Sequence, residues 1–155
     1  AFDEAIRRDF LPEHAAIAAG ERETWCAEAR GCLAYVVVLD QFSRNVYSDT
    51  PRAFAQDALA LVLAQELVAS GQDRSLPVAQ RVFAYMPYMH SESKEIHKVA
   101  EQLFKANGIE SNYQFELQHK AIVDRFGRYP HRNAILGRQS TEEELAFLAL
   151  PGSAF

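Results

Sequence analysis

The stretch SESKEIHKVAEQLFKAN, residues 91–107, decides the fold class that this sequence predicts. The apolar side chains that recur at every third or fourth position in it are Ile96, Val99, Ala100, Leu103 and Phe104. This recurrence is the spacing of one face of an α-helix. Ser91 is suited to cap the N-terminus of the helix, and Gly108 is suited to end it.

Helical spacing also appears downstream and upstream of this stretch. A second helix is predicted over residues 112–126, with Glu116 and Lys120 on its outer face. The side chains predicted on its buried stripe are Phe115, His119, Ile122, Val123 and Phe126. Pro51 is predicted to begin a helix that ends near residue 70. Its expected stripe is Phe54, Ala58, Leu61 and Val62.

The remaining segments give shorter or less regular patterns. A short helix is predicted over Pro77–Met86, because Pro87 disfavours helical geometry at the residue before it. A C-terminal helix begins with a capping box at Thr141 and stops before Pro151. At the N-terminus, the helically spaced apolar residues are Phe2, Ile6 and Phe10, and we expect Pro12 to bend or break that helix.

Residues 21–42 are ambiguous. The run Tyr35–Leu39 has the composition of a buried strand, but Trp25, Ala29, Leu33 and Val36 share one helix face and nothing interrupts them. A lone strand would also have no partner in this chain. We therefore predict an all-α protein, an array of about seven or eight helices in antiparallel hairpins.

Length and composition set further bounds. The chain has 155 residues, the size of one domain, so residues 1–155 are interpreted as a single helical domain. The formal net charge of −5 disfavours nucleic-acid binding, which requires a basic face. The longest apolar run, Cys32–Leu39, is far shorter than the ~20 residues that span a bilayer. The sequence predicts a cytoplasmic protein without a membrane partner, and the start at Ala1 indicates that an N-terminal segment is missing.

The two cysteines are predicted to be reduced. Cys26 and Cys32 are six residues apart in what is interpreted as one helix, so about 9 Å of axial rise separates their Cα atoms. A disulfide bond tolerates a Cα separation of up to ~7 Å. Both residues are therefore interpreted as small core residues.

Two polar segments lie beside apolar ones where helices end or turn. In residues 40–45, Asp40 ends the most apolar helix and needs a partner such as Arg44; the alternative to a site is a helix-end ion pair. In residues 85–92, a proline bend brings His90 to the start of a helix, where backbone N–H groups attract anions. No third ligand accompanies His90 and Glu92 at a metal-binding interval, so no metal is predicted, and the alternative here is a cap and turn.

A basic island between residues 119 and 138 is the strongest local signal. It holds one acidic residue, Asp124, and five basic ones, which are Lys120, Arg125, Arg128, Arg132 and Arg138. Interleaved aromatic residues and arginine forks suit a phosphate, a carboxylate or an acidic partner segment. The alternative is that these arginines pair with the acidic residues of the rest of the chain.

Asp57 and His119 occupy positions on apolar stripes, where a buried polar group needs a hydrogen-bond partner. Each is either a satisfied core residue or a sign that the helices enclose a polar pocket. The familiar phosphate-binding loops and the Gly-x-Ser-x-Gly elbow are absent from the sequence, so no cofactor is predicted.

Four motifs occur in the order that one known family shows. They are Asp40-Gln41-Phe42-x-Arg44-Asn45, Arg52-Ala53-Phe54-Ala55-x-Asp57, Tyr85-Met86-Pro87-x-x-His90-Ser91-Glu92 and Phe126-Gly127-Arg128-x-Pro130-His131-Arg132-Asn133. With them the chain resembles, over nearly its whole length, the mainly bacterial domain-of-unknown-function family numbered nine hundred and twenty-four. The resemblance implies a fold similar to right-handed tetratricopeptide-like arrays, but no reaction. The family usually has a further aromatic-rich segment before residue 1, and proline where this chain has Ser43.

Two functions from different classes follow. In the first, the signature residues form a pocket for a small anionic molecule, in which Arg44, Arg128 and Arg132 hold the anion and Asn45 and Asn133 orient it. His90 or His131 would transfer protons with Asp40 or Glu92 as the orienting group, and Asp57 and His119 would complete the lining. In the second, the array is a scaffold that binds a peptide or protein and does not catalyse. Because the signatures lie in turns and helix ends, we favour the pocket and expect residues 40–45, 90–92 and 128–133 to meet in space.

Overall fold

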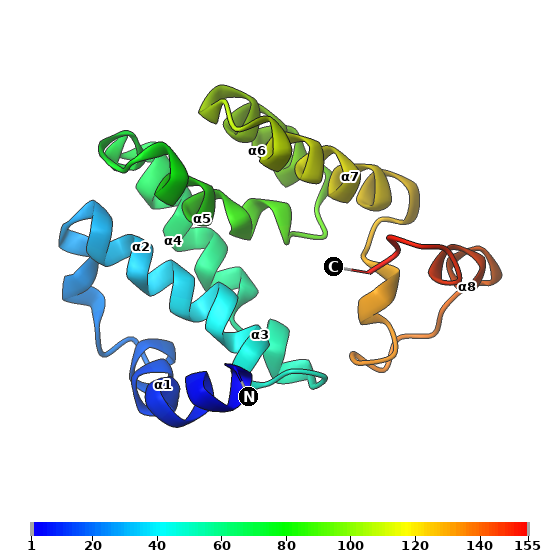
Figure 1. Cartoon of the computed structure of the whole chain (residues 1–155), viewed down its shortest axis with the longest axis horizontal. Coiled ribbons are helices and arrows are strands. Elements are labelled where there is room, and N and C mark those ends of the chain that lie inside the picture. Colours follow the sequence, from blue (N-terminus) through cyan, green and yellow to red (C-terminus); the bar gives the residue numbers. More distant parts are fainter. Residues whose placement is uncertain (1, 155) are drawn as a thin grey trace.

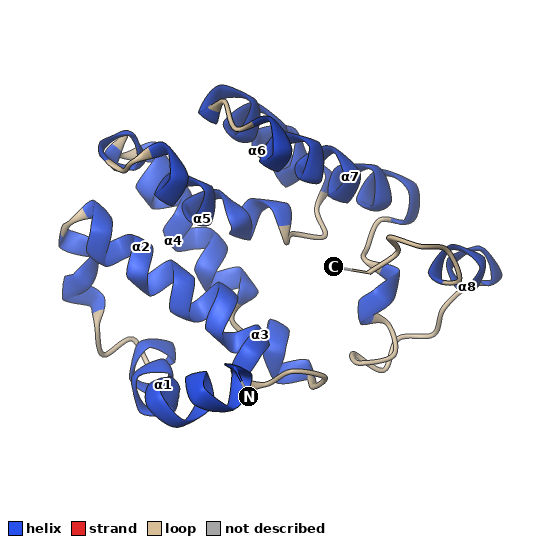
Figure 2. Ribbon diagram, in the orientation of Figure 1, coloured by secondary structure: helices blue, strands red, loops and turns tan. Residues whose placement is uncertain are grey.

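The helical prediction holds for residues 2–154, the part of the chain that this computed structural model describes, and no strand occurs there (Figure 2). The α-helices are α1 (Phe2–Ala18), α2 (Ala29–Val37), α3 (Ser43–Val46), α4 (Asp57–Ala69), α5 (Val78–Met89), α6 (Lys94–Asn107), α7 (Glu110–Phe126) and α8 (Glu142–Leu148). The 3-10 turns between them are Glu23–Ala27, Pro51–Phe54, Gln72–Ser75 and Pro130–Arg132, and Val38–Phe42 forms a π-helical turn.

Consecutive helices pack side by side along most of the chain. Contacts join α4 to α5, α5 to α6 and α6 to α7, and short turns connect them, so each pair is an antiparallel hairpin. In Figure 1, α1 lies at one end of this array beside α3, and α8 lies at the opposite side with the 3-10 turn Pro130–Arg132. The all-α class is thus confirmed, whereas a tetratricopeptide-like arrangement stays a prediction.

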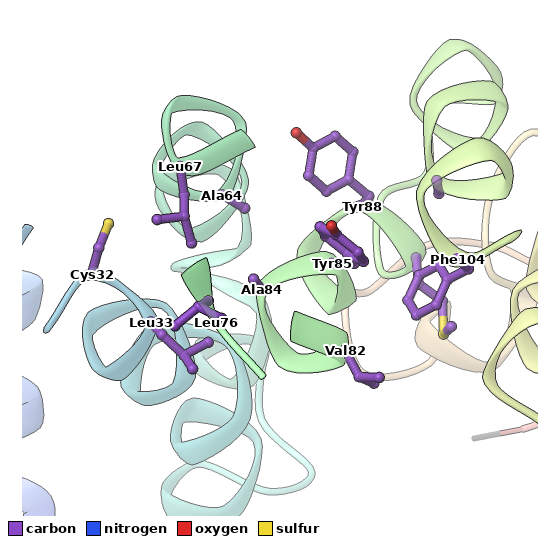
Figure 3. Packing of buried hydrophobic residues seen from close by; sticks show 12 residues of the cluster. Cys32, Leu33, Ala64, Leu67, Leu76, Val82, Ala84, Tyr85, Tyr88 and Phe104 are labelled. Carbon is purple, nitrogen blue, oxygen red and sulfur yellow. The ribbon is translucent and has the colours of Figure 1, made fainter. Parts of the chain in front are cut away.

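The largest apolar core lies between α2, α4, α5 and α6 (Figure 3). Leu33, Leu67 and Ala84 come from three different helices, and the rings of Tyr85 and Phe104 meet edge to face with their centroids 5.9 Å apart. Two smaller apolar clusters flank it, one joining α1 to α2 and α4 and one at the C-terminal end of α7. Burial of these faces gives the array its main stabilisation.

The buried faces are rotated from the predicted stripes. In α6 the buried residues are His97, Ala100, Phe104 and Asn107, while Val99 is 44% exposed. In α7 Phe115 is 52% exposed and Glu116, predicted on the outer face, is fully buried. In α4 the predicted stripe residue Val62 is exposed and Ala60, Ala64 and Leu67 are buried. Each of these three helices packs against more than one neighbour, so small and polar residues share the buried faces with the large apolar ones.

Helix boundaries differ from prediction at prolines and caps. Helix α1 continues through Pro12 and α5 continues through Pro87 to Met89. In α5 the proline falls in the last turn, and the burial of Tyr88 and Met89 outweighs the one backbone hydrogen bond that is lost. Helix α6 begins after Ser93, whose hydroxyl accepts from the Ile96 amide, so Ser93 is the N-cap rather than Ser91. The predicted capping box of α8 at Thr141 is confirmed.

Residues 21–42 form separate short helical elements. The alternative of a strand over residues 35–39 is wrong, because α2 runs to Val37 and the π-helical turn follows. Cys26 lies in the 3-10 turn and Cys32 in α2, so they do not share one helix. Both cysteines are free, as predicted, but the single helix from which we derived their separation is wrong, and the two sulfur atoms lie 2.8 Å apart.

Candidate functional site

The π-helical turn that follows α2 places Asp40 in the interior. The Asp40 carboxylate is almost fully buried and accepts from His90 Nδ1 at 2.7 Å, from Arg44 Nη1 at 3.3 Å and from the Gln41 amide. Burial alone would raise the pKa of Asp40, but the charge and hydrogen bond of His90 and the charge of Arg44 outweigh it, so the pKa is lowered. Asp40 is therefore a carboxylate that fixes the ring of His90.

Asp57, at the first turn of α4, joins two arginines from distant segments. Arg44 donates to both carboxylate oxygens in a fork, each at 3.0 Å, and Arg132 Nη1 donates to Oδ2 at 3.2 Å. The predicted requirement of Asp57 for a partner is thereby met. One of its partners comes from the basic island and the other from the Asp40 segment.

Arg132 is the most enclosed cation of the cluster, at 6% exposure. Its guanidinium stacks between the rings of Phe54 and Tyr129, with centroid distances of 4.6 and 4.8 Å, and Nη2 donates to the His90 carbonyl at 2.9 Å. Its Nε–H group is buried and has no hydrogen-bond acceptor among the described residues. Arg132 therefore keeps a buried donor that the protein does not use.

The three polar segments meet, as predicted from the sequence. His90 contacts Asp40 on one side and Arg132 on the other. Glu92 accepts from the Tyr129 amide at 2.7 Å and thereby attaches the segment after α5 to the segment after α7. Residues more than eighty positions apart in the sequence thus form one hydrogen-bonded cluster.

A cavity of about 510 Å³ lies against this cluster. Its charged, imidazole and aromatic lining residues include Arg44, His90, His119, His131, Arg132, Phe54 and Tyr129. A neighbouring cavity of about 430 Å³ shares Phe54, His90 and Arg132 and adds Asp57 and Glu92. Volumes of this size are typical of sites for small molecules.

Two of the histidines in the cavity wall are neutral at physiological pH. Burial lowers the pKa of His119 and of His131 to about 4. His119 is fixed by a 2.7 Å contact between Nδ1 and the Phe115 carbonyl, one turn earlier in α7. Neutral imidazoles can both donate and accept hydrogen bonds, so the wall offers both kinds of group beside its two guanidinium ions.

Several residues assigned to the site have other partners. Arg128 forms a fork with Glu144 at 2.7 and 2.8 Å. Asn133 is buried and binds Ser140, Glu144 and Arg138 through its side chain. Arg128 and Asn133 thus hold the segment before α8, and neither lines the two cavities; nor does Asn45.

The basic island is neutralised by acidic residues, which was the alternative interpretation. Glu92 receives a fork from Arg138 at 2.7 and 2.9 Å. The other pairs outside the cavity are Lys120–Asp124, Arg125–Glu143 and Arg128–Glu144. Each of the five basic residues of the island therefore has an acidic partner, and what remains at the cavity is a charge-balanced cluster with an unused arginine donor.

Sequence reasoning missed a buried pair behind the cavity. His97 Nδ1 contacts Glu116 at 2.8 Å, and both side chains are fully buried. His97 Nε2 contacts the Ser91 carbonyl at 2.8 Å and the Tyr129 hydroxyl at 3.1 Å. Burial raises the pKa of Glu116. The detectable signal was the helical spacing of His97 from Ala100 and Phe104, two apolar residues of the same buried face.

Fold and site together define a class: an all-helical protein in which a buried cluster of carboxylates, arginines and histidines underlies a cavity. The chain belongs to a family of bacterial proteins of unknown function, DUF924, whose model matches residues 1–152. A solved structure of a protein of unknown function from Agrobacterium tumefaciens is similar to it, with 37% identity and a TM-score of 0.92 over 96% of this chain and 84% of that one. No curated protein matches the chain.

Residues 2–154 lack both a membrane-spanning helix and a cluster of metal-binding side chains. No helix among them is long and apolar enough to cross a membrane. No group of three or more histidine, cysteine or acidic side chains within residues 2–154 is arranged to hold a metal ion.

Proposed function

We propose that the 510 Å³ cavity binds a small anionic molecule through a carboxylate or phosphate group, with Arg44 and Arg132 as its anchors. The observation that carries the proposal is that two arginines and three histidines from separate segments line one cavity. Arg132 supports it most directly, because its buried Nε–H lacks an acceptor and a ligand oxygen would supply one.

The ligand has an apolar part as well as an anionic one. Phe54 and Tyr129 lie on the same wall as the arginines, and Ala53 and Ile135 add aliphatic surface. Asp57 already neutralises part of the positive charge of both arginines. The anionic group of the ligand is therefore bound by hydrogen bonds from the guanidinium groups, not by an excess of positive charge.

The same site can transfer a proton. Asp40 holds Nδ1 of His90, as a carboxylate orients the imidazole of a general acid–base residue, and His90 also lines the cavity. In this proposal His90 exchanges the proton, Asp40 orients it and His131 is a neutral hydrogen-bonding group. Asp40 rather than Glu92 takes the orienting role, since Glu92 is bound to Arg138 and Tyr129.

A thermal-unfolding screen tests the binding. The full chain is melted with inorganic phosphate and with a panel of phosphorylated and carboxylated metabolites, and a compound that binds the folded state raises the melting temperature. We expect at least one such compound, and we expect its shift to disappear in Arg44→Gln, measured against that variant's own melting temperature. No shift with any compound would contradict the proposal.

Arg125→Gln is the matched control. Arg125 is an exposed arginine whose partner, Glu143, is also exposed, and neither lines the cavity. The control should keep the full ligand shift. For a compound that binds, NMR of the ligand then tests whether it is converted, and His90→Asn should stop conversion while the melting shift remains. The peptide-binding scaffold stays a prediction.

A further inference from the structure

A pair of thiols lies away from the proposed anion site, where the 3-10 turn Glu23–Ala27 meets α2. The side chains of Cys26 and Cys32 contact each other, and their two sulfur atoms are 2.8 Å apart. Both cysteines are free. Cys26 is partly exposed and Cys32 is 4% exposed, so one thiol of the pair is accessible and the other is enclosed.

Gly31 makes this contact possible. A Cβ atom at residue 31 would lie 2.0 Å from the Trp25 carbonyl oxygen, and that oxygen belongs to the main chain and cannot swing aside. Only glycine therefore lets the turn pack so closely on the first turn of α2. The chain reverses at Glu28, whose backbone is extended, and this reversal brings Cys26 back over Cys32.

We propose that Cys26 and Cys32 form a reversible intramolecular disulfide bond and that this dithiol is a redox modification site of the protein. The two sulfur atoms of a disulfide are about 2.0 Å apart, so the pair has to close by less than 1 Å, about the reach of a small side-chain rotation. The two thiols come from separate elements joined at one extended residue, which leaves room for that adjustment.

The reaction is thiol–disulfide exchange with a low-molecular-weight disulfide such as oxidised glutathione. The Cys26 thiolate attacks one sulfur of the oxidant, its S–S bond breaks, and one glutathione thiolate leaves. Cys32 then loses its proton to solvent and attacks Cys26 Sγ, and the second glutathione thiolate leaves and is protonated. Two protein thiols are oxidised, and one glutathione disulfide is reduced to two glutathione molecules.

The surroundings assign the order of the two cysteines. Burial raises the pKa of the Cys32 thiol to about 12, and the hydrogen bond to Cys26 acts in the same direction. Cys32 is therefore a protonated, enclosed thiol that resolves the mixed disulfide, while the partly exposed Cys26 meets the oxidant first. A cavity of about 150 Å³ beside both sulfur atoms, lined also by Glu66, Ser70 and Gln72, gives space for the departing thiol.

Intact-protein mass spectrometry tests the proposal. The reduced full chain is incubated with excess oxidised glutathione, quenched in acid, and weighed with and without prior reduction. We expect a monomer lighter by two hydrogen atoms that no longer reacts with N-ethylmaleimide and that regains both thiols in reduced glutathione. A lasting glutathione adduct on the unaltered chain, a disulfide-linked dimer or two thiols that remain alkylatable would each overturn it.

Two single variants check the assigned order. Cys32→Ser should accumulate one glutathione on Cys26, because nothing resolves the mixed disulfide. Cys26→Ser should take up none while folded, because Cys32 is enclosed. The reverse pattern, or equal labelling of both variants, would contradict the mechanism. Thermal unfolding of both reduced variants verifies that each is folded during the incubation.

Discussion

The array of α2, α4, α5 and α6 and the segment from Gly127 to Thr141 are stabilised in different ways. The array buries aliphatic and aromatic side chains against one another. The segment has one 3-10 turn and is held by arginine forks on carboxylates, namely Arg128 on Glu144 and Arg138 on Glu92. The difference shows that arginines clustered in a sequence can stabilise the fold. Of Arg128, Arg132 and Arg138, Arg132 lines the two cavities and the other two do not.

The largest effect is expected from Phe104→Ala in the array. Phe104 is almost fully buried against Tyr85, so truncation removes apolar burial and leaves a void. We expect a loss of about 3–5 kcal/mol in the free energy of unfolding, measured by urea denaturation. Phe115→Ala, at a residue that is 52% exposed, is the matched control and should lose less than about 1 kcal/mol. Equal losses would show that the array is not held by this core.

A smaller but specific effect is expected from Asp57→Ala. The substitution leaves Arg44 and the buried Arg132 without their shared carboxylate, and we expect a loss of about 3 kcal/mol in the free energy of unfolding. Inorganic phosphate should recover part of that loss in the variant, because an external anion can take the place of the carboxylate.

The exposed pair provides the contrast. Glu143→Ala removes the partner of exposed Arg125 and should change the free energy of unfolding by less than about 0.5 kcal/mol, with no response to phosphate. If phosphate stabilises Asp57→Ala and Glu143→Ala equally, the two cavity arginines do not form an anion site.

An effect smaller than that of Asp57→Ala concerns pH. The pKa of His119 is about 4 in the folded protein against 6.5 for an ordinary histidine, so the unfolded chain binds more protons between these values. Stability therefore falls as pH drops below 6.5, by about 1 kcal/mol from His119 between pH 7 and pH 5.5. His119→Asn keeps a donor for the Phe115 carbonyl but does not titrate, and its denaturation curves should show a correspondingly weaker pH dependence. An unchanged dependence would contradict the buried neutral state of His119.

The fold was predictable to the extent that helices depend on local pattern. The stripe in residues 91–107 identified α6, and glycine and threonine caps located the ends of α6 and α8. The buried faces were less predictable, because neighbours on two sides decide which residues are enclosed. Glu116 is an example. Its position in the sequence predicts the outer face of α7, but in the folded protein it is buried and contacts His97 of α6.

The candidate site was partly predictable. Asp40 and Asp57 were identified because a carboxylate beside apolar residues must find a partner, and each of them has one. His90 was identified from the proline bend that precedes it, and Arg132 from the basic island; the two contact each other. Arg128 and Asn133 belong to the same motif, yet they bind Glu144 instead. Membership of a motif indicates that a residue has a specific role, but it does not show whether the side chain lines the cavity or holds the neighbouring segments together.

By itself the sequence determined the all-α class, the main helices and the need of the buried polar residues for partners, because spacing, capping and desolvation act over a few residues. The tertiary structure decided which carboxylate neutralises which arginine, and it alone revealed the contact between Cys26 and Cys32. These pairings depend on the packing of elements that are distant along the chain or separated by a reversal such as that at Glu28. Such packing follows from the burial of all the helices together, and no local pattern specifies it.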